Sequence, residues 1–131
     1  MICALDTNII VELLRGRDRA LSEKYLSKPP SNYSVPEMVR AELLFGARVS
    51  AKVDENRRAV EIFLAPLRLL PFQGEAVEHY AEIRRDLEKT GCSIGPNDLI
   101  IAATARSNGH ALITRNTLEF QRVPALAVEE W

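Results

Sequence analysis

Short apolar segments alternate with helical patterns along this chain of 131 residues. Alternation of this kind is typical of an α/β fold with a mainly parallel sheet, in which right-handed crossovers place helices on both faces. The expected strands are residues 2–5, 33–35, 67–71, 111–113 and 126–128. We therefore expect one domain over residues 1–131, with a five-stranded sheet and about six helices.

Glycine, proline and capping residues mark where the helices begin and end. Gly16 and Gly91 stand where a helix would stop, at the position that favours a left-handed residue. Ser34 and Glu37 have capping-box spacing, and Pro36 suits a first helical turn. The expected helices run from the first strand to residue 14, then over residues 19–28, 36–50, 54–64, about 76–90 and 96–107.

Composition and cysteine usage narrow the class of protein. The formal net charge of −1 gives no hint of a polyanion partner, although a local basic stripe would be enough for one. Cys3 and Cys92 form no CxxC or zinc-ligand spacing, so we expect a disulfide-free protein of a reducing compartment. No apolar run approaches the roughly 20 residues that span a bilayer. We expect a soluble, cytoplasmic protein.

Three carboxylates lie in apolar surroundings. Asp6, Glu42 and Asp98 have no Lys or Arg three or four residues away, the distances at which helical neighbours meet. Removing an unpartnered carboxylate from water costs on the order of several kcal/mol. Such a group becomes protonated, finds a partner elsewhere in the fold, or binds a metal ion.

Each of these acids also has an ordinary explanation. Asp6 could cap the first helix, Asp98 could interact with a helix dipole, and Glu42 could form a long-range ion pair. A bound hard cation such as Mg²⁺ or Mn²⁺ would explain all three together, because these ions prefer carboxylate oxygens. The two histidines, His79 and His110, are interpreted as structural or solvated rather than as ligands.

The order of the acids along the chain supports their convergence. Sites in parallel sheets form outside the carboxyl ends of the strands. Asp6 follows the first strand, Glu42 lies in the helix after the second, and Asp98 lies in the helix before the fourth. Residues 114–116 leave the end of that fourth strand. We expect these groups to reach one rim of the sheet.

Four segments, in this order and at these separations, resemble the PIN-domain ribonucleases, specifically the VapC-type toxins of bacterial toxin–antitoxin pairs. They are LDTNI at residues 5–9, VRAELLFG at 39–46, IGPND at 94–98 and TRNTLEF at 114–120. The resemblance covers essentially the whole chain. It implies a three-layer α/β/α sandwich with a five-stranded parallel sheet, and a Mg²⁺- or Mn²⁺-dependent endoribonuclease.

The resemblance also assigns the acidic residues. It implies that Asp6, Glu42 and Asp98 bind the metal and take part in catalysis. Many PIN domains carry an aspartate where this chain has Asn116, so Glu119 is carried over as the fourth acid and Asn116 as a polar catalytic neighbour.

Further residues are expected to contact the substrate. Thr7 and Thr114 are expected to act as orienting hydroxyls, and Arg115 to hold RNA beside Asn116. A short basic stretch after the first helix could also contribute to RNA binding, or it could be an ordinary solvated surface. It contains Arg15, Arg17 and Arg19.

The implied reaction is in-line hydrolysis of an RNA phosphodiester, which leaves 5′-phosphate and 3′-hydroxyl ends. The implied substrate is structured RNA such as tRNA. Implied partners are a cognate VapB-type antitoxin protein, with part of the apolar first helix lining its groove, and a second copy of the chain in a homodimer.

Two other functions stay open from the residues. A PIN-like module that binds RNA or protein without cleaving it would tolerate Asn116 in place of an acid. A phosphotransfer enzyme on a doubly wound sheet would need an Asp-x-Asp motif or a lysine after the fourth strand, whereas Asp6 is followed by Thr7 and Asn8.

Overall fold

A computed structural model describes all residues, 1–131, and contains one five-stranded sheet in which every neighbouring pair is parallel. The strand order is β3-β2-β1-β4-β5, so the first strand lies at the centre. The strands are β1 (Cys3–Leu5), β2 (Tyr33–Pro36), β3 (Arg68–Leu70), β4 (Ala111–Thr114) and β5 (Val128–Glu130). Five parallel strands confirm the predicted α/β fold.

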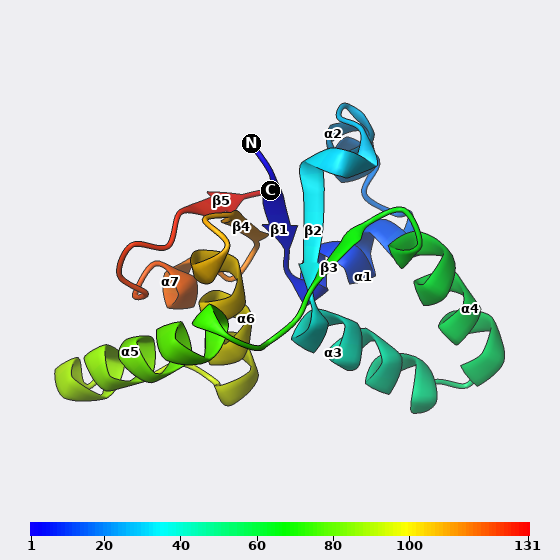
Figure 1. The fold of residues 1–131 in the computed structure, drawn as a ribbon. Helices are drawn as coiled ribbons and strands as arrows, with labels where there is room; N and C mark the ends of the chain where they lie inside the picture. Colours follow the sequence, from blue (N-terminus) through cyan, green and yellow to red (C-terminus); the bar gives the residue numbers. More distant parts are fainter.

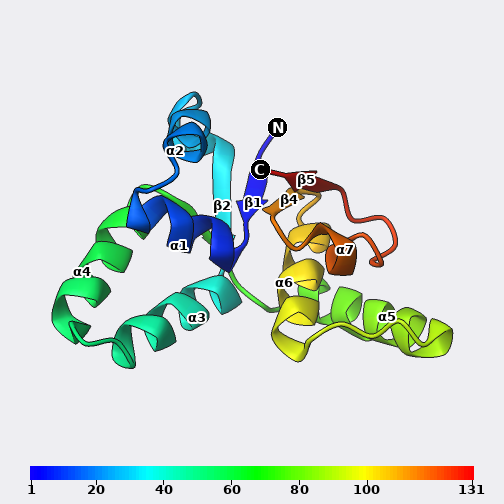
Figure 2. The ribbon, with the colours of Figure 1, turned by 180° about the vertical axis from the view of Figure 1, so that it is seen from behind.

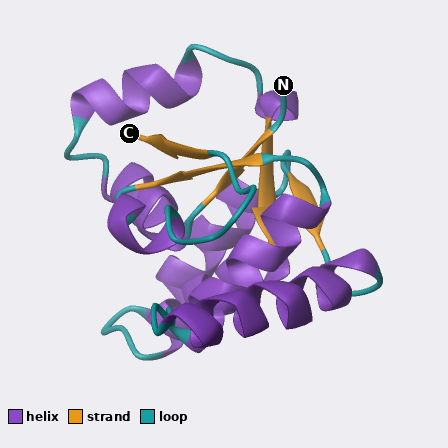
Figure 3. Cartoon of the chain, turned by 90° about the vertical axis from the view of Figure 1, so that its left-hand side faces the viewer, coloured by secondary structure: helices purple, strands orange, loops and turns teal.

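Helices cover both faces of this sheet. They are α1 (Thr7–Arg15), α2 (Arg19–Leu26), α3 (Glu37–Arg48), α4 (Val53–Leu64), α5 (Glu75–Thr90), α6 (Pro96–Ser107) and α7 (Thr117–Phe120), with a 3₁₀ turn, η1, at Pro30–Asn32. Figures 1 and 2 show α1, α3 and α4 on one side of the central strands and α5, α6 and α7 on the other. Figure 3 views the strands from the side, with helices around them. This is the expected three-layer α/β/α sandwich.

The core forms where both helical layers meet the sheet. A cluster of 23 buried apolar residues runs from β1 through α3 and α6 to β4. Ala4 and Leu5 in the central strand are fully buried, as an apolar strand covered on both faces should be. No helix is both long and apolar enough to cross a membrane.

Most predicted boundaries agree with the structure to within a residue or two, the usual uncertainty of helix ends. Gly16 and Gly91 end α1 and α5 with φ of 68° and 70°, the left-handed conformation that glycine adopts at low cost. The last strand is shifted, however, to Val128–Glu130. The chain first turns through Ala125, whose φ is 60°, before Val128 pairs with Leu112.

One local prediction is wrong, and one short helix was not predicted. Ser34 does not form a capping box with Glu37, because β2 continues through Pro36 and keeps Ser34 inside the strand. The Ser34 hydroxyl lies 2.9 Å from His110 Nδ1 instead. Helix α7 was not anticipated, since four residues are too few to show a helical period.

Candidate active site

Asp6 and Thr114 meet at the carboxyl end of the sheet. Leu5 of β1 pairs with Ile113 of β4, and one residue further the Thr114 hydroxyl donates a 2.6 Å hydrogen bond to Asp6 Oδ2. The Asp6 backbone N–H also donates to the Ile113 carbonyl, at 3.0 Å. Asp6 is only 4% exposed. The parallel register of the two central strands therefore holds this carboxylate in place.

Asp6 serves as a helix cap at the same time. Its Oδ1 accepts a 2.8 Å hydrogen bond from the Thr7 N–H, at the first residue of α1. The capping explanation is therefore correct, but it accounts for only part of the site. Burial raises the pKa of Asp6, the Thr114 and Thr7 hydrogen bonds oppose the rise, and the Glu42 charge adds to it. The carboxylate remains without a cationic partner.

Glu42 links three helices. It projects from α3, its Oε1 accepts a 2.5 Å hydrogen bond from the Thr7 hydroxyl of α1, and its Oε2 accepts a 3.4 Å bond from Asn97 Nδ2 of α6. The nearby Arg40 pairs with Glu37 instead. No salt bridge reaches Glu42, so the long-range ion pair considered for it does not exist.

Asp98 and Glu119 form the other half of the cluster. Asp98 lies in the first turn of α6, and Glu119 lies on α7. The pKa of Asp98 is raised to about 7, mainly by desolvation, and also by a hydrogen bond shared with Glu119 and by the charges of Asp6, Glu119 and Glu42. A helix dipole alone would lower this pKa. Asp98 is therefore governed by the surrounding acids and by burial.

None of the four acids forms a salt bridge, although eight such pairs occur elsewhere in the chain. Their side chains do not form a closed ligand set, since no three carboxylate, histidine or cysteine groups lie close enough to enclose an ion by themselves. The donors are all oxygen atoms. This chemistry fits Mg²⁺ or Mn²⁺, which retain several waters and need one or two protein carboxylates, and not a structural zinc.

The residues after β4 support the cluster through side-chain and backbone contacts. The Asn116 N–H donates a 2.9 Å hydrogen bond to the Thr114 hydroxyl, and Asn116 Nδ2 donates a 3.1 Å bond to Glu119 Oε2. One threonine hydroxyl thus joins Asp6 to Asn116, which in turn orients Glu119. Asn97 was missed as a site residue, although it directly precedes Asp98 in the 94–98 segment.

The predicted substrate-contacting arginines have protein partners. Arg115 Nη2 lies 2.6 Å from Asp18 Oδ2, and its Nε donates to the Trp131 carbonyl at 3.0 Å. Arg15 pairs with Glu12 and Arg19 with Glu23, as expected for a solvated helical surface. Arg17 forms no ion pair. Any RNA contact by Arg115 would have to compete with Asp18.

Glu42 lines two cavities in this part of the fold. One of about 460 Å³ adjoins the acids and is lined by Thr7, Met38, Ala41, Glu42, Phe45 and Asn97. A groove of about 550 Å³ between α1, α3 and α4 is lined by Val11, Leu14, Arg15, Glu42, Leu43, Gly46, Ala47, Asn56, Ala59 and Val60.

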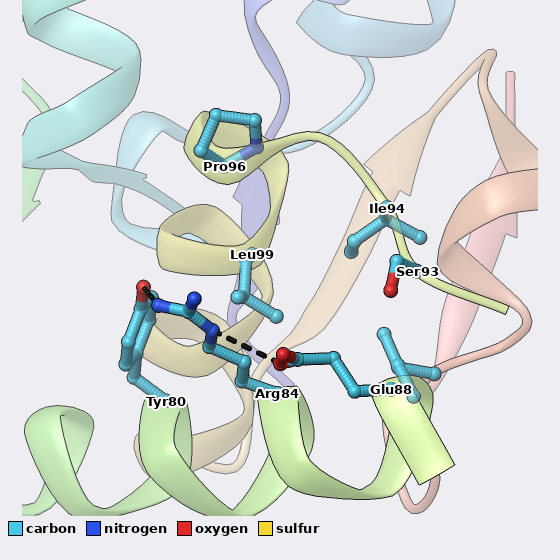
Figure 4. A pocket seen from close by; sticks show the side chains of 8 residues that line it. Tyr80, Arg84, Glu88, Ser93, Ile94, Pro96 and Leu99 are labelled. Atoms are coloured by element: carbon cyan, nitrogen blue, oxygen red, sulfur yellow. Dashed lines mark hydrogen bonds and ion pairs between the residues drawn. The ribbon is translucent and has the colours of Figure 1, made fainter. Parts of the chain in front are cut away.

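A separate cavity, of about 250 Å³, lies between α5 and α6 (Figure 4). Arg84 lines this cavity and donates hydrogen bonds to two other lining residues, to the Tyr80 hydroxyl at 3.1 Å and to Glu88 at 3.3 Å. Its charged groups are thereby paired with each other. It has no lining residue in common with the acidic cluster.

The fold and the acidic rim define a PIN domain, and residues 3–126 match the sequence profile of that family. Full-length relatives then narrow the assignment. Ribonuclease VapC2 of Rickettsia felis is 36% identical over 132 residues, covering 100% of this chain and 98% of the relative. The tRNA(fMet)-specific endonuclease VapC of Salmonella typhimurium is 31% identical over 127 residues, covering 97% and 96%. The chain belongs to the PIN domain family, among its VapC ribonucleases.

Solved structures agree with this assignment. The chain superposes with a TM-score of 0.91 on the crystal structure of VapBC2 from Rickettsia felis bound to a promoter DNA fragment, at 34% identity and coverage of 100% and 99%. It superposes with a TM-score of 0.93 on DNA-bound VapBC from Salmonella typhimurium, at 30% identity and the same coverage. The predicted family and fold are therefore confirmed.

Proposed function

We propose that this chain is a Mg²⁺- or Mn²⁺-dependent endoribonuclease toxin that hydrolyses structured RNA of the tRNA class and is neutralised by a cognate VapB-type antitoxin. One observation carries the proposal. Four acids from four separate segments, Asp6, Glu42, Asp98 and Glu119, share one end of the sheet and none has a cationic partner. Uncompensated negative charge of this density favours a divalent ion.

Asp6, Asp98 and Glu42 would hold the ion together with the waters that Mg²⁺ or Mn²⁺ retains, and Glu119 would complete the acidic rim. A bound divalent ion supplies a hydroxide nucleophile at neutral pH and stabilises charge on the phosphoryl oxygens. The Thr114 hydroxyl holds the Asp6 carboxylate, and the Thr7 hydroxyl holds the Glu42 carboxylate, so both carboxylates are oriented before substrate binds. Asn116 keeps Glu119 turned toward Asp98. Water attack leaves 5′-phosphate and 3′-hydroxyl ends.

The relatives support the substrate and partner classes. One relative is named as a tRNA(fMet)-specific endonuclease, and several solved relatives are VapBC complexes. The groove between α1, α3 and α4 suits an apolar helix or strand of an antitoxin, because Val11, Leu14 and Val60 line it and Arg15 borders it. A homodimer and a cytoplasmic site of action complete the proposal.

The test compares two aspartates with similar helical positions. Asp98 and Asp54 both lie in the first turn of a helix, but Asp54 is exposed and lines neither of the cavities that Glu42 lines. We expect Asp98→Asn to abolish Mg²⁺-dependent cleavage of a tRNA pool, and Asp54→Asn to leave it unchanged. Asp6→Asn should also abolish cleavage.

Chelation and end mapping complete the test. EDTA should stop cleavage, and Mg²⁺ or Mn²⁺ should restore it. Full activity in EDTA, or products with 2′,3′-cyclic ends, would contradict the proposal. RNA binding by wild-type protein without any cleavage in Mg²⁺ or Mn²⁺ would instead identify the non-cleaving module that Asn116 leaves possible.

A further inference from the structure

The cavity beside the acids contains an exposed aromatic ring that the core does not use. Phe45 is 67% exposed, and it lines the 460 Å³ cavity together with Met38 and Ala41 of the same helix. These residues are spaced three, four and seven apart, so they share one face of α3. An aromatic ring left in water beside a polar site is a common docking surface for a planar ligand.

Glu42 ties this cavity to the proposed catalytic rim. It lines the cavity and also accepts hydrogen bonds from Thr7 and Asn97, which line the cavity too. A group in the cavity would therefore lie directly beside the position of the scissile phosphate. This inference rests on the proposed ribonuclease function, since that function places RNA at the rim.

The charge of the lining selects against an anionic occupant. Glu42 is the only charged residue of the cavity, which has no Lys or Arg. A phosphate group or an acidic peptide would meet one negative charge and no counter-charge there. A neutral, planar and partly polar group fits better. The cavity volume lies within the range of roughly 300–1,000 Å³ typical of small-molecule sites.

Asn97 supplies the polar edge that such a group would need. Its Nδ2 reaches Glu42 at 3.4 Å, a long hydrogen bond, and its carbonyl oxygen accepts none. The Asn97 side chain is exposed to the cavity, so the carboxamide can offer a donor and an acceptor side by side. Unstacked bases present matching edges, while duplex bases keep theirs paired.

We propose that this cavity binds one unpaired nucleobase adjacent to the scissile phosphate, with Phe45 as the stacking surface and Asn97 at the base edge. The enzyme would then select single-stranded loops over duplex RNA. A second copy of the chain is the competing occupant, because exposed apolar residues also form dimer contacts.

The test measures binding separately from cleavage. Fluorescence anisotropy is recorded with a labelled single-stranded oligoribonucleotide of mixed sequence, and with the same strand in a duplex, in the Asp98→Asn background. We expect Phe45→Ala to raise the Kd for the single strand about tenfold, in line with loss of one base–aromatic stack, and to leave the Kd for the duplex unchanged. Phe45→Trp should retain tight binding.

Ile62 provides the matched control. It is 65% exposed, nearly as much as Phe45, but lies on α4 outside the cavity. Ile62→Ala should leave both Kd values unchanged. The same single-strand Kd in the parent and in Phe45→Ala would overturn the inference. An equal loss of single-strand affinity in Phe45→Ala and Ile62→Ala would overturn it too.

Two further measurements separate the alternatives. If light scattering shows that Phe45→Ala converts a dimer to a monomer without changing the single-strand Kd, the cavity binds a second copy and the inference is wrong. Cleavage by the protein with Asp98 intact is assayed on the same strand. If the strand is cleaved but Phe45→Ala does not change the single-strand Kd, the base-binding inference alone is wrong. If Phe45→Ala raises the Kd but the strand is not cleaved, the ribonuclease function alone is wrong.

Discussion

The Thr114 hydroxyl donates a 2.6 Å hydrogen bond to Asp6 Oδ2, joining residues 108 positions apart at the ends of two neighbouring central strands. The hydroxyl oxygen of Thr114 also accepts a hydrogen bond from the Asn116 N–H, at 2.9 Å. One hydroxyl therefore orients a buried carboxylate and the turn that carries Asn116. The site is held together by the sheet, since both strands deliver these groups at one edge.

Thr114→Val keeps the shape of this side chain and removes its hydroxyl. A hydrogen bond to a charged group contributes about 1.5–3 kcal/mol, so we expect a loss of stability of about 2 kcal/mol at neutral pH. Because that bond lowers the pKa of Asp6, its loss should raise this pKa and shift the acidic limb of the cleavage profile to higher pH. Thr114→Ser should restore both properties. A pH–rate profile that does not move in Thr114→Val would remove Thr114 from the positioning of Asp6.

Asp98 should make the metal-free protein less stable as pH rises. Its pKa in the folded chain is about 7, raised from 3.8, so the folded state keeps a proton that the unfolded chain has already released. Its favourable contribution is full below the unfolded pKa and is lost as pH rises through about 7. Thermal unfolding in EDTA should therefore show a decline in Tm between about pH 4 and pH 8, over the interval set by these two pKa values.

Asp98→Asn provides the comparison for that decline. The neutral amide cannot ionise, so this variant should lack most of the decline and be more stable than the parent at pH 8, by on the order of 1–2 kcal/mol after allowance for solvent screening. Added Mg²⁺ should stabilise the parent more than Asp98→Asn. Parallel Tm curves for the two proteins would show that Asp98 ionises normally.

The Asp18–Arg115 pair should compete with RNA binding. Both side chains are more than one-third exposed, at 36% and 37%, so solvent screens the pair and it contributes little to stability. Asp18 also caps α2 through Leu21 N–H, and asparagine caps equally well. Asp18→Asn should therefore release Arg115 with little loss of Tm.

The released arginine should strengthen RNA affinity a few-fold and steepen its salt dependence. Arg115→Ala should reverse both effects. Glu23→Gln breaks the exposed Arg19 pair and serves as the control. RNA affinity that is the same in Asp18→Asn and Arg115→Ala would leave Arg115 with a structural role only, tying α2 to the Trp131 carbonyl.

The groove between α1, α3 and α4 can be blocked without replacing any of the four acids. Ala59 is exposed on α4 and lines the groove, so Ala59→Glu introduces a charge among Val11, Leu14 and Val60. We expect antitoxin affinity to fall at least tenfold, the consequence of about 1.4 kcal/mol lost on burying an unpaired charge, with RNA cleavage retained. Calorimetric titration with the cognate antitoxin measures this. Ile62→Glu, on the same helix but outside the groove, should bind the antitoxin normally.

Much of the fold was predictable from local pattern. The amphipathic face of α5, the apolar run of β1 and the glycines at positions 16 and 91 each report a property of neighbouring residues. Helix α6 was predicted at its observed bounds, Pro96–Ser107, because proline marks its first turn and its apolar residues are contiguous. Helix α7 and the shift of β5 were not predicted, because elements of four and three residues carry too little periodic signal.

The candidate site was only partly predictable, and the reason differs by residue. Asp6, Glu42 and Asp98 stood out because apolar neighbours without cations are a local signal of an unusual carboxylate. Asn97 gave no such signal, since an exposed asparagine next to a helix start is ordinary capping chemistry. Its contact with Glu42, 55 positions away, exists only because α3 and α6 meet at the same rim.

Periodicity and residue type were thus sufficient for most of the elements and for the choice of Asp6, Glu42 and Asp98, because both depend on interactions over a few positions, whereas Glu119 came from the family resemblance. The contacts between residues distant in sequence could be identified only in the folded chain. The β3-β2-β1-β4-β5 order brings Thr114 to Asp6 and draws Ser34 to His110, while the packing of α2 against the C-terminal end turns Arg115 toward Asp18. Contacts between residues so far apart in sequence depend on sheet register and helix packing, which no short stretch of residues encodes.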